Sequence, residues 1–295
     1  MKKYVIPWCE LLFIFLNLSG CVVVEPQPPE PETILTEPID VVEPTIPEDS
    51  TIPTKPIDVE KDLTSPEIET LLIQNRVALV IGNGSYQTRS LKNTPINDAR
   101  AMESVLSKLG FAVTLVTNVN KPKMENAIGE FINKLDSSTL GFFYYSGHGV
   151  QHAGKNFLIP IEAMSKISEP RDLQHAVSAN EVSEKMNSKS QLSLIVLDAC
   201  RDTPFSFTRG KNSGLAAMLN AEGMLIAYAT SPGTVALAGS GNSPYTKHLL
   251  HFIEYKWPIG QVLSKVRAAV RRETNEKQIP WYEASIEGKV IIGNK

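Results

Sequence analysis

The sequence predicts an α/β fold in which a mostly parallel sheet carries helices on both of its faces. From about residue 76 onward, short apolar runs of strand length alternate with segments of helical periodicity. The apolar runs are continuous, as is typical of central parallel strands that are buried on both faces. The 295 residues and 42% hydrophobic content are sufficient for one large core together with tails.

The expected elements follow one another in a regular order. Strands are expected at residues 77–82, 111–116, 140–145, 192–197 and 224–229, with an edge strand at 286–292. Helices are expected at residues 97–109, 124–135, 177–186, 245–254 and 259–272. The first helix places Ala101, Val105 and Leu109 on one face, and Gly110 provides its stop.

The first 21 residues resemble a bacterial lipoprotein signal. Lys2 and Lys3 precede an apolar stretch that ends in small residues before Cys21. This stretch is shorter than the about 20 residues of a membrane-spanning helix, so processing is expected instead of a stable span. We expect lipids on Cys21 to anchor the protein to a membrane of the bacterial cell envelope, on the extracytoplasmic side. The alternative is an ordinary apolar N-terminus whose cysteine has no role.

Residues 22–66 are expected to be a disordered tether, and residues 67–295 the folded domain. The tether contains ten of the 20 prolines and carries a charge of −9. Such a composition cannot bury enough apolar surface to fold. The domain carries +5 without a dense stripe of Lys and Arg, so we expect no nucleic-acid partner.

Two reactive side chains each follow an apolar run. His148 stands in Ser-Gly-His-Gly after residues 140–145, and Cys200 stands in Asp-Ala-Cys-Arg-Asp after residues 192–197. Sites in open α/β sheets form beyond the carboxyl ends of the strands. If these strands are neighbours, a thiol and an imidazole share one crevice, as nucleophilic acyl transfer requires. Cys200 is the only cysteine after residue 21, so the domain has no disulfide and no cysteine metal cluster. The alternative for Cys200 is a small buried apolar residue.

Several motifs occur together in one order. They are Arg76 to Gly82, Asn97-Asp98-Ala99, Tyr145 to Gly149, Leu197 to Asp202, Ala229 to Gly233 and Asn242 to Thr246. With these motifs, residues 76–292 resemble a bacterial caspase-like cysteine peptidase of the metacaspase and orthocaspase branch. The resemblance implies a caspase-like three-layer sandwich.

The resemblance also implies a catalytic dyad. Cys200 would be the nucleophile, and His148 would be the general base that later protonates the leaving amine. The backbone N–H groups of Gly149 and Cys200 would form the oxyanion hole. The family needs no acidic third member, and none is assigned.

Substrate specificity is expected to depend on Asp98 and Asp198, which the resemblance places in the primary substrate pocket. Two carboxylates favour an Arg or Lys side chain before the scissile bond, so the expected substrates are proteins or peptides with a basic cleavage site. Ser231 and Ser243 stand in segments that border the substrate cleft in the family. The alternatives are a helix N-terminal acid for Asp98 and a strand-end acid bonded to nearby backbone for Asp198.

The residues after the nucleophile depart from the usual metacaspase string. They read Arg201-Asp202-Thr203, where that string has His-Ser-Gly. The departure leaves the dyad intact. No convincing acidic cluster suggests calcium, so we expect neither a metal nor another cofactor. Arg209 and Lys211 lie in the following loop and are candidate self-cleavage sites, with a solvated basic loop as the alternative.

Two other functions compete with a peptidase. A catalytically silent caspase-like module would bind peptides or scaffold an assembly, although such modules usually lose the cysteine or the histidine. A nucleotide-binding protein is disfavoured, because the Gly-x4-Gly-Lys-Ser/Thr pattern is absent and the dinucleotide glycine spacing is not met. His248 and His251 are three apart on an expected helix, but without a third ligand we expect a surface pair and not a metal site.

Overall fold

The computed structural model describes residues 70, 71, 73, 75–200, 215, 218, 222–231 and 241–295. The predicted signal at 1–21, the predicted tether at 22–66 and the residues Cys21, Arg209 and Lys211 lie outside this part of the chain. Within the described part, no helix has the length and apolar character needed to cross a membrane.

The centre of the fold is a mostly parallel sheet with the strand order β3-β2-β4-β7-β8-β9. Its parallel strands are β2 (Asn75–Gly82), β3 (Ala112–Thr117), β4 (Thr139–His152), β7 (Leu192–Cys200) and β8 (Met224–Tyr228). β9 (Trp281–Ser285) runs antiparallel to β8. Two short antiparallel strands, β5 (Lys155–Leu158) and β6 (Val177–Ser178), continue from β4. β1 (Thr70–Leu71) and β10 (Lys289–Val290) form a separate two-stranded sheet.

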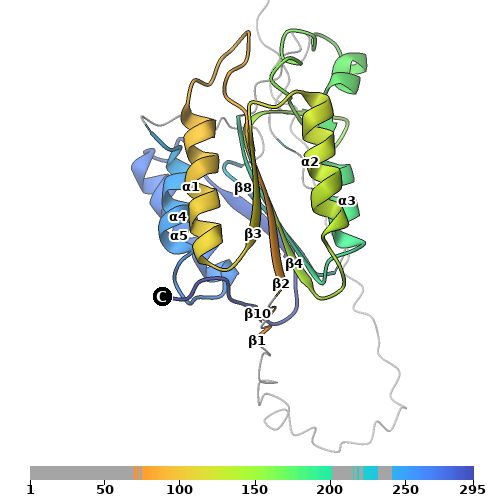
Figure 1. Ribbon diagram of the computed structural model, residues 1–295. Helices are drawn as coiled ribbons and strands as arrows, with labels where there is room; N and C mark the ends of the chain where they lie inside the picture. The colour runs from red at the N-terminus through yellow and green to blue at the C-terminus, as the bar shows by residue number, and fades with distance from the viewer. Residues whose placement is uncertain are drawn as a thin grey trace, which may run out of the picture. The chain divides into compact units, whose positions relative to one another are not determined.

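Helices cover both faces of this sheet (Figure 1). One face carries α1 (Thr94–Lys108), α4 (Pro244–Phe252) and α5 (Ile259–Glu273), and the other carries α2 (Lys121–Asn133) and α3 (Ala179–Asn187). Side chains alternate along the buried strands. In β2, Val80 therefore joins the core beneath α1, α4 and α5, whereas Leu79 joins the core beneath α2 and α3. This double cover confirms the predicted three-layer α/β fold.

The two strands that carry the predicted dyad are longer than predicted. β4 continues to His152 and β7 continues to Cys200, so both dyad residues lie within their strands and not just beyond them. β4 is extended because its last residues form a hairpin with β5, in which Gly149 lies opposite Leu158. The apolar run alone did not indicate this extension, since most of the added residues are polar or glycine.

The edge strand predicted at residues 286–292 is wrong. The strand that borders β8 is β9, and residues 289–290 pair with β1 instead. Val290 and Ile292 are buried in the core beneath α4 and α5, which explains their apolar character without a place in the main sheet.

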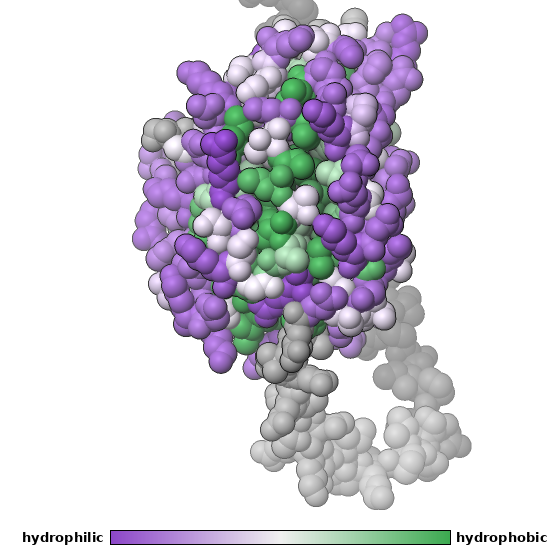
Figure 2. All heavy atoms as spheres, viewed as in Figure 1, coloured by the Kyte–Doolittle hydropathy of each residue, from purple (hydrophilic) through white to green (hydrophobic). Residues whose placement is uncertain are grey.

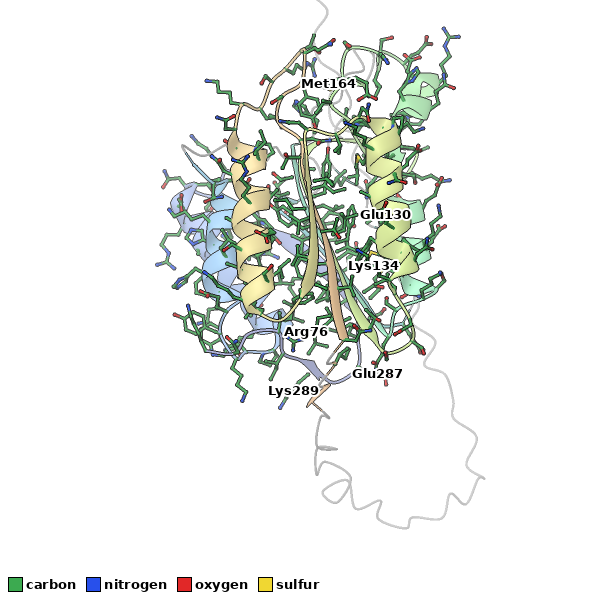
Figure 3. All side chains as sticks on the ribbon, viewed as in Figure 1. Arg76, Glu130, Lys134, Met164, Glu287 and Lys289 are labelled. Atoms are coloured by element: carbon green, nitrogen blue, oxygen red, sulfur yellow. The ribbon has the colours of Figure 1, made fainter. Side chains whose placement is uncertain are left out.

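Arg76 joins the beginning of β2 to distant parts of the chain (Figure 3). One guanidinium nitrogen donates to the carbonyl oxygens of Leu109 (2.9 Å) and Ile292 (3.0 Å), and Nε donates to that of Ile73 (3.2 Å). The guanidinium also lies 5.7 Å from the ring centroid of Phe111. The end of α1, the C-terminal segment and the chain before β2 are thereby held together by one side chain.

Candidate active site

The register between β4 and β7 brings the two predicted dyad positions together. The two strands are parallel neighbours, and their Cα partners run from Leu140 opposite Leu192 to His148 opposite Cys200. Cα atoms of adjacent strands lie about 4.8 Å apart. The structure therefore places the backbones of His148 and Cys200 next to each other at one end of the sheet.

The imidazole of His148 is held by backbone and tyrosine groups. The residue is only 2% exposed, and its Nε2 lies 2.6 Å from the carbonyl oxygen of Arg89. A carbonyl oxygen can only accept, so Nε2 carries hydrogen in this contact and the neutral ring keeps Nδ1 as its basic nitrogen. The Tyr86 hydroxyl accepts from the His148 N–H (2.9 Å), and the Tyr86 ring lies 4.5 Å from the imidazole between centroids. The ring is thereby fixed in orientation and tautomer.

The glycines beside His148 leave room for these groups. A Cβ at Gly147 would lie 2.6 Å from the Tyr145 hydroxyl and 2.8 Å from the Tyr86 hydroxyl. The Tyr145 hydroxyl donates to the carbonyl oxygen of His148 (2.7 Å). Only glycine therefore allows both tyrosines to reach the backbone of the predicted base.

The backbone N–H of Gly149 has a defined direction within β4. The Ile159 N–H donates to the carbonyl oxygen of His148 (3.1 Å), so the next pair in the hairpin, Gly149 with Leu158, is a non-hydrogen-bonded pair. In such a pair the N–H points away from the partner strand. The N–H of Gly149 therefore points away from β5 and toward β7, the strand that ends at Cys200.

Asp98 and Asp198, called the acid pair below, share one hydrogen-bond network although they are 100 residues apart. Asp98 is 0% exposed and accepts from the Asn242 side chain (2.9 Å), the Ser243 N–H (2.9 Å) and the Ser146 hydroxyl (3.2 Å). Asp198 is 5% exposed and accepts from the hydroxyls of Ser243 and Thr246. Two buried carboxylates thus lie beside the strand ends that carry the predicted dyad.

Burial and mutual repulsion change the titration of the acid pair. Burial, followed by the negative charge of Asp198, raises the pKa of Asp98 from 3.8 to about 7, although three hydrogen bonds act in the opposite direction. Burial also raises the pKa of Asp198 above its ordinary value, against the hydrogen bonds from Ser243 and Thr246. The pair therefore retains part of a proton near neutral pH.

Ser243 connects the acid pair to a helix. It is the N-cap of α4, and its hydroxyl accepts from the Thr246 N–H (3.0 Å) while donating to Asp198. The backbone N–H of the same residue donates to Asp98. The positive end of the α4 dipole therefore faces the acids. Ser231, the other predicted cleft serine, donates its hydroxyl to the carbonyl oxygen of Ile279 (2.7 Å).

Four contacts at the site were not predicted from the sequence. The carbonyl oxygen of Arg89 is a backbone atom and has no side-chain pattern that could reveal it. The roles of Tyr86, Asn242 and Thr246 depend on contacts between distant segments. A signal was present for Asn242 and Thr246, because both belong to the motif at 242–246 that carries the resemblance.

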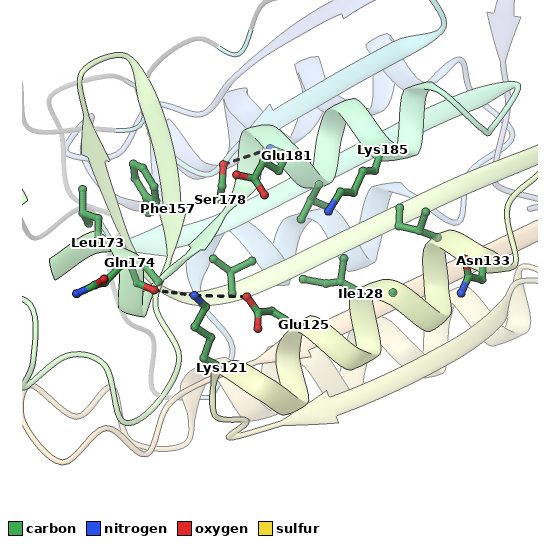
Figure 4. A pocket seen from close by; sticks show the side chains of 15 residues that line it. Lys121, Glu125, Ile128, Asn133, Phe157, Leu173, Gln174, Ser178, Glu181 and Lys185 are labelled. Atoms are coloured by element: carbon green, nitrogen blue, oxygen red, sulfur yellow. Dashed lines mark hydrogen bonds and ion pairs between the residues drawn. The ribbon is translucent and has the colours of Figure 1, made fainter. Parts of the chain in front are cut away.

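Other features of the described residues lie away from this site. A cavity of about 560 Å³ opens between α2 and α3, and its described lining, which includes Ile128, Phe157 and Val182, contains none of the predicted site residues (Figure 4). Nε2 of His248 lies 2.7 Å from a carboxylate oxygen of Glu273. No group of three or more metal-ligating side chains occurs in the described part of the chain.

The sheet is open and is covered by helices on both faces. At the strand ends, a histidine lies opposite a cysteine on the neighbouring strand. This is the arrangement of a caspase-like α/β sandwich. The family model of the caspase domain matches residues 75–291. The chain therefore belongs to the caspase family. Proteins of this family are cysteine peptidases, which supports that class of activity at the level of the family.

Known relatives agree with this family. The human mucosa-associated lymphoid tissue lymphoma translocation protein 1 is 30% identical over 131 residues, which cover 44% of this chain and 15% of that protein. Caspase a of Danio rerio is 25% identical over 134 residues, which cover 44% of this chain and 35% of that protein. The chain thus matches only a minor part of the length of these relatives.

Solved structures share the fold. Caspase-1 from Spodoptera frugiperda superposes with a TM-score of 0.55 at 18% identity, covering 79% of this chain and 95% of that one. Protein GSU0716 from Geobacter sulfurreducens gives a TM-score of 0.55 at 15% identity, covering 75% of this chain and 97% of that one. At these identities the similarity shows the fold alone. The metacaspase and orthocaspase branch and the lipoprotein signal stay predictions.

Proposed function

We propose that this protein is a cysteine endopeptidase that cleaves after Arg or Lys, with Cys200 as nucleophile and His148 as general base. The observation that carries the proposal is the register of β4 and β7, which sets His148 opposite Cys200. Period-two alternation adds support, because positions 146 and 148 of β4 belong to one face of the sheet, as do positions 198 and 200 of β7. Each dyad position therefore shares its face with a residue of the acid-pair network.

The proposed reaction proceeds in two steps through an acyl-enzyme. The thiol proton of Cys200 passes to Nδ1 of His148, and the thiolate attacks the scissile carbonyl carbon. The resulting oxyanion accepts from the N–H groups of Gly149 and Cys200. His148 then protonates the leaving amine as the C–N bond breaks. In the second step, His148 removes a proton from water, the hydroxide adds to the thioester, and the carboxylic acid leaves as the thiol forms again.

The acid pair would supply the preference for basic residues. A guanidinium or ammonium group that reaches Asp98 and Asp198 replaces neutral donors with a charged one and favours full ionisation of both acids. Binding a basic side chain therefore displaces the retained proton. A substrate with Asp at the same position would meet like charge and be rejected.

Hydrolysis of fluorogenic peptides ending in Arg, Lys or Asp tests this function, using the full chain under reducing conditions. We expect turnover of the Arg and Lys peptides that is lost in Cys200→Ala and in His148→Ala. Turnover of the Asp peptide alone would keep the dyad and refute the role of the acid pair. Absence of turnover with every peptide, together with retained peptide binding by the wild-type chain, would favour a catalytically silent binding module.

Two proposals concern residues outside the described part. For the lipid anchor at Cys21, a Cys21→Ala chain should no longer partition with membranes, and continued partitioning would refute the anchor. For self-cleavage after Arg209 or Lys211, long incubation should convert the wild-type chain into two fragments whose masses match cleavage at one of these residues, whereas Cys200→Ala should stay intact. A wild-type chain that also stays intact would refute it.

A further inference from the structure

β3 is an uncharged edge strand with an exposed side. It consists of Ala-Val-Thr-Leu-Val-Thr, and among the described residues it pairs with β2 alone. Ala112 is exposed and the other five residues are partly exposed. Figure 2 shows the result, a band of hydrophobic surface along β3 between the hydrophilic outer faces of α1 and α2.

The backbone of β3 also has hydrogen-bonding groups that β2 does not use. The Asn118 N–H donates to the carbonyl oxygen of Gly82 on β2 (2.9 Å). Because backbone direction alternates along a strand, the N–H and C=O groups of Val113, Leu115 and Thr117 point away from β2. These three residues therefore present a row of donors and acceptors at the free edge.

Edge strands are normally protected from pairing with other chains by charges, prolines or bulges. The opposite edge of the sheet follows this rule, because β9 carries Glu283. β3 has neither a charge nor a proline. A six-residue segment of this composition is prone to uncontrolled strand pairing unless a specific partner covers it.

We propose that β3 pairs antiparallel with β3 of a second copy of this chain, about a two-fold axis at Leu115. In this register Leu115 lies opposite Leu115 of the other copy, and Val113 lies opposite Thr117. The three residues with outward backbone groups then form hydrogen-bonded pairs, about six hydrogen bonds in total. The opposed side chains are apolar or β-branched, so no like charges meet. The contact is isologous, as in most homodimers.

The position of α2 fits the same axis. α2 packs on both β2 and β3, so it lies between them in projection. With strands about 4.8 Å apart, the two α2 helices would lie roughly 10 Å apart, which is an ordinary helix-packing distance. Edge pairing of the two sheets would thus bring the two α2 helices into direct antiparallel contact.

Charges on α2 make this contact self-complementary. Lys134, at the end of α2, donates to the Thr114 hydroxyl (3.3 Å), and Glu130 is one helical turn earlier (Figure 3). Their midpoint is therefore close to the level of Leu115. A two-fold axis at that level sets Glu130 of each copy opposite Lys134 of the other. Neither residue has an ion pair within the described part of its own chain.

These features favour a second copy over an unrelated partner. β3 carries no charge that would attract a peptide from another protein. Glu130 and Lys134 instead complement the same two residues of a second copy. The proposed interface involves neither dyad strand and neither member of the acid pair. It is independent of the proposed peptidase activity.

Sedimentation equilibrium of the full chain in density-matched detergent tests the proposal. We expect a dimer for the wild-type chain and a monomer for Leu115→Lys, which places a charge on the axis. The matched control is Ala284→Lys on the other edge strand, β9, which should remain dimeric. A monomeric wild-type chain would overturn the proposal, and the partner of β3 would then be a strand other than β3 of a second copy. Dissociation by Ala284→Lys but not by Leu115→Lys would also overturn it.

A charge exchange on α2 keeps the test decisive if Leu115→Lys fails to fold. Glu130→Lys alone should raise the dimer dissociation constant at least tenfold, because two lysines then face each other. The double variant Glu130→Lys with Lys134→Glu should restore the wild-type value. Both residues are exposed, so neither change should prevent the domain from folding. Failure of the double variant to restore dimerisation would refute the two-fold register.

Discussion

Replacement of Asp98 by Asn should stabilise the domain at neutral and alkaline pH. Asp98 is fully buried, and its three hydrogen-bond donors surround a carboxyl whose pKa is about 7. Asn keeps the oxygen that accepts from Asn242 and Ser243, and the Ser146 hydroxyl can rotate to accept from the new amide. The substitution therefore removes a buried negative charge and conserves the local hydrogen bonds.

The magnitude follows from the change in pKa. In the unfolded chain Asp98 titrates near 3.8, whereas in the folded chain it titrates at about 7. The folded state thus holds the proton more tightly, so this contribution to stability is complete below pH 3.8 and is lost as the pH rises through 7. A shift of about 3 pKa units at 1.36 kcal/mol each corresponds to about 4 kcal/mol as an upper bound. Asn does not titrate, so Asp98→Asn does not lose this stability as the pH rises.

Urea unfolding of the wild-type chain and Asp98→Asn between pH 4 and pH 8 measures the effect. The free energies of unfolding should be similar at pH 4, and the variant should be up to about 4 kcal/mol more stable at pH 8. Asp136→Asn is the matched control, because hydrogen bonds from Ser138 and Thr139 lower the pKa of that exposed carboxyl. Its folded form favours ionisation, and this contribution to stability is lost only below about pH 4, so the control should be slightly less stable than the wild-type chain by a nearly constant amount up to pH 8.

Two results of this experiment would refute the raised pKa of Asp98. If Asp98→Asn and the wild-type chain change in stability with pH in parallel, Asp98 is ionised throughout and the repulsion within the acid pair is not significant. If the variant is less stable than the wild-type chain at pH 8, the negative charge contributes a favourable interaction that outweighs its burial.

Three further outcomes follow from the site and the fold. The KM for an Arg peptide should rise about tenfold from pH 8 to pH 6, because the acid pair takes up its proton. Asp98→Asn should raise KM at pH 8 and remove this pH dependence. If the variant keeps the wild-type dependence of KM on pH, Asp98 takes no part in substrate binding. Gly147→Ala should cost about 1–3 kcal/mol and lower kcat/KM, because its Cβ would lie 2.6 Å from the Tyr145 hydroxyl; wild-type stability would show that the tyrosine moves freely. Arg76→Met should lower the free energy of unfolding in urea by about 2–4 kcal/mol, because it leaves the carbonyl oxygens of Leu109 and Ile292 unpaired. The control Arg100→Met, at an exposed residue, should have no effect. Equal free energies of unfolding for the two variants would refute the linking role of Arg76.

The sequence predicted the buried parts of the fold better than its borders. Continuous apolar runs indicated β2, β4, β7 and β8, because both faces of these strands are buried. β9 was missed because its residues, Trp-Tyr-Glu-Ala-Ser, are only partly buried and form no apolar run. The predicted edge strand at 286–292 followed Val290 and Ile292, which are buried for another reason. Apolar character reports burial, but it does not report which neighbour provides it.

The candidate site shows a similar division. Side chains with distinct chemistry, such as His148 and Asp98, could be singled out from motifs. The pairing of His148 with Cys200 depended on strand order, which no local pattern determines. The carbonyl oxygen of Arg89 belongs to a residue with a φ of 55°, a backbone conformation that its sequence context did not reveal.

The N-cap of α4 makes the first turn of that helix sensitive to events at the acid pair. Ser243 holds both acids and the Thr246 N–H at once, so opening of this turn and loss of a hydrogen bond to Asp98 or Asp198 are one event. Any ligand that alters the ionisation of the acids therefore changes the local opening free energy of α4. Amide hydrogen exchange at Thr246 would then serve as a built-in reporter of occupancy, readable even in a variant that performs no chemistry.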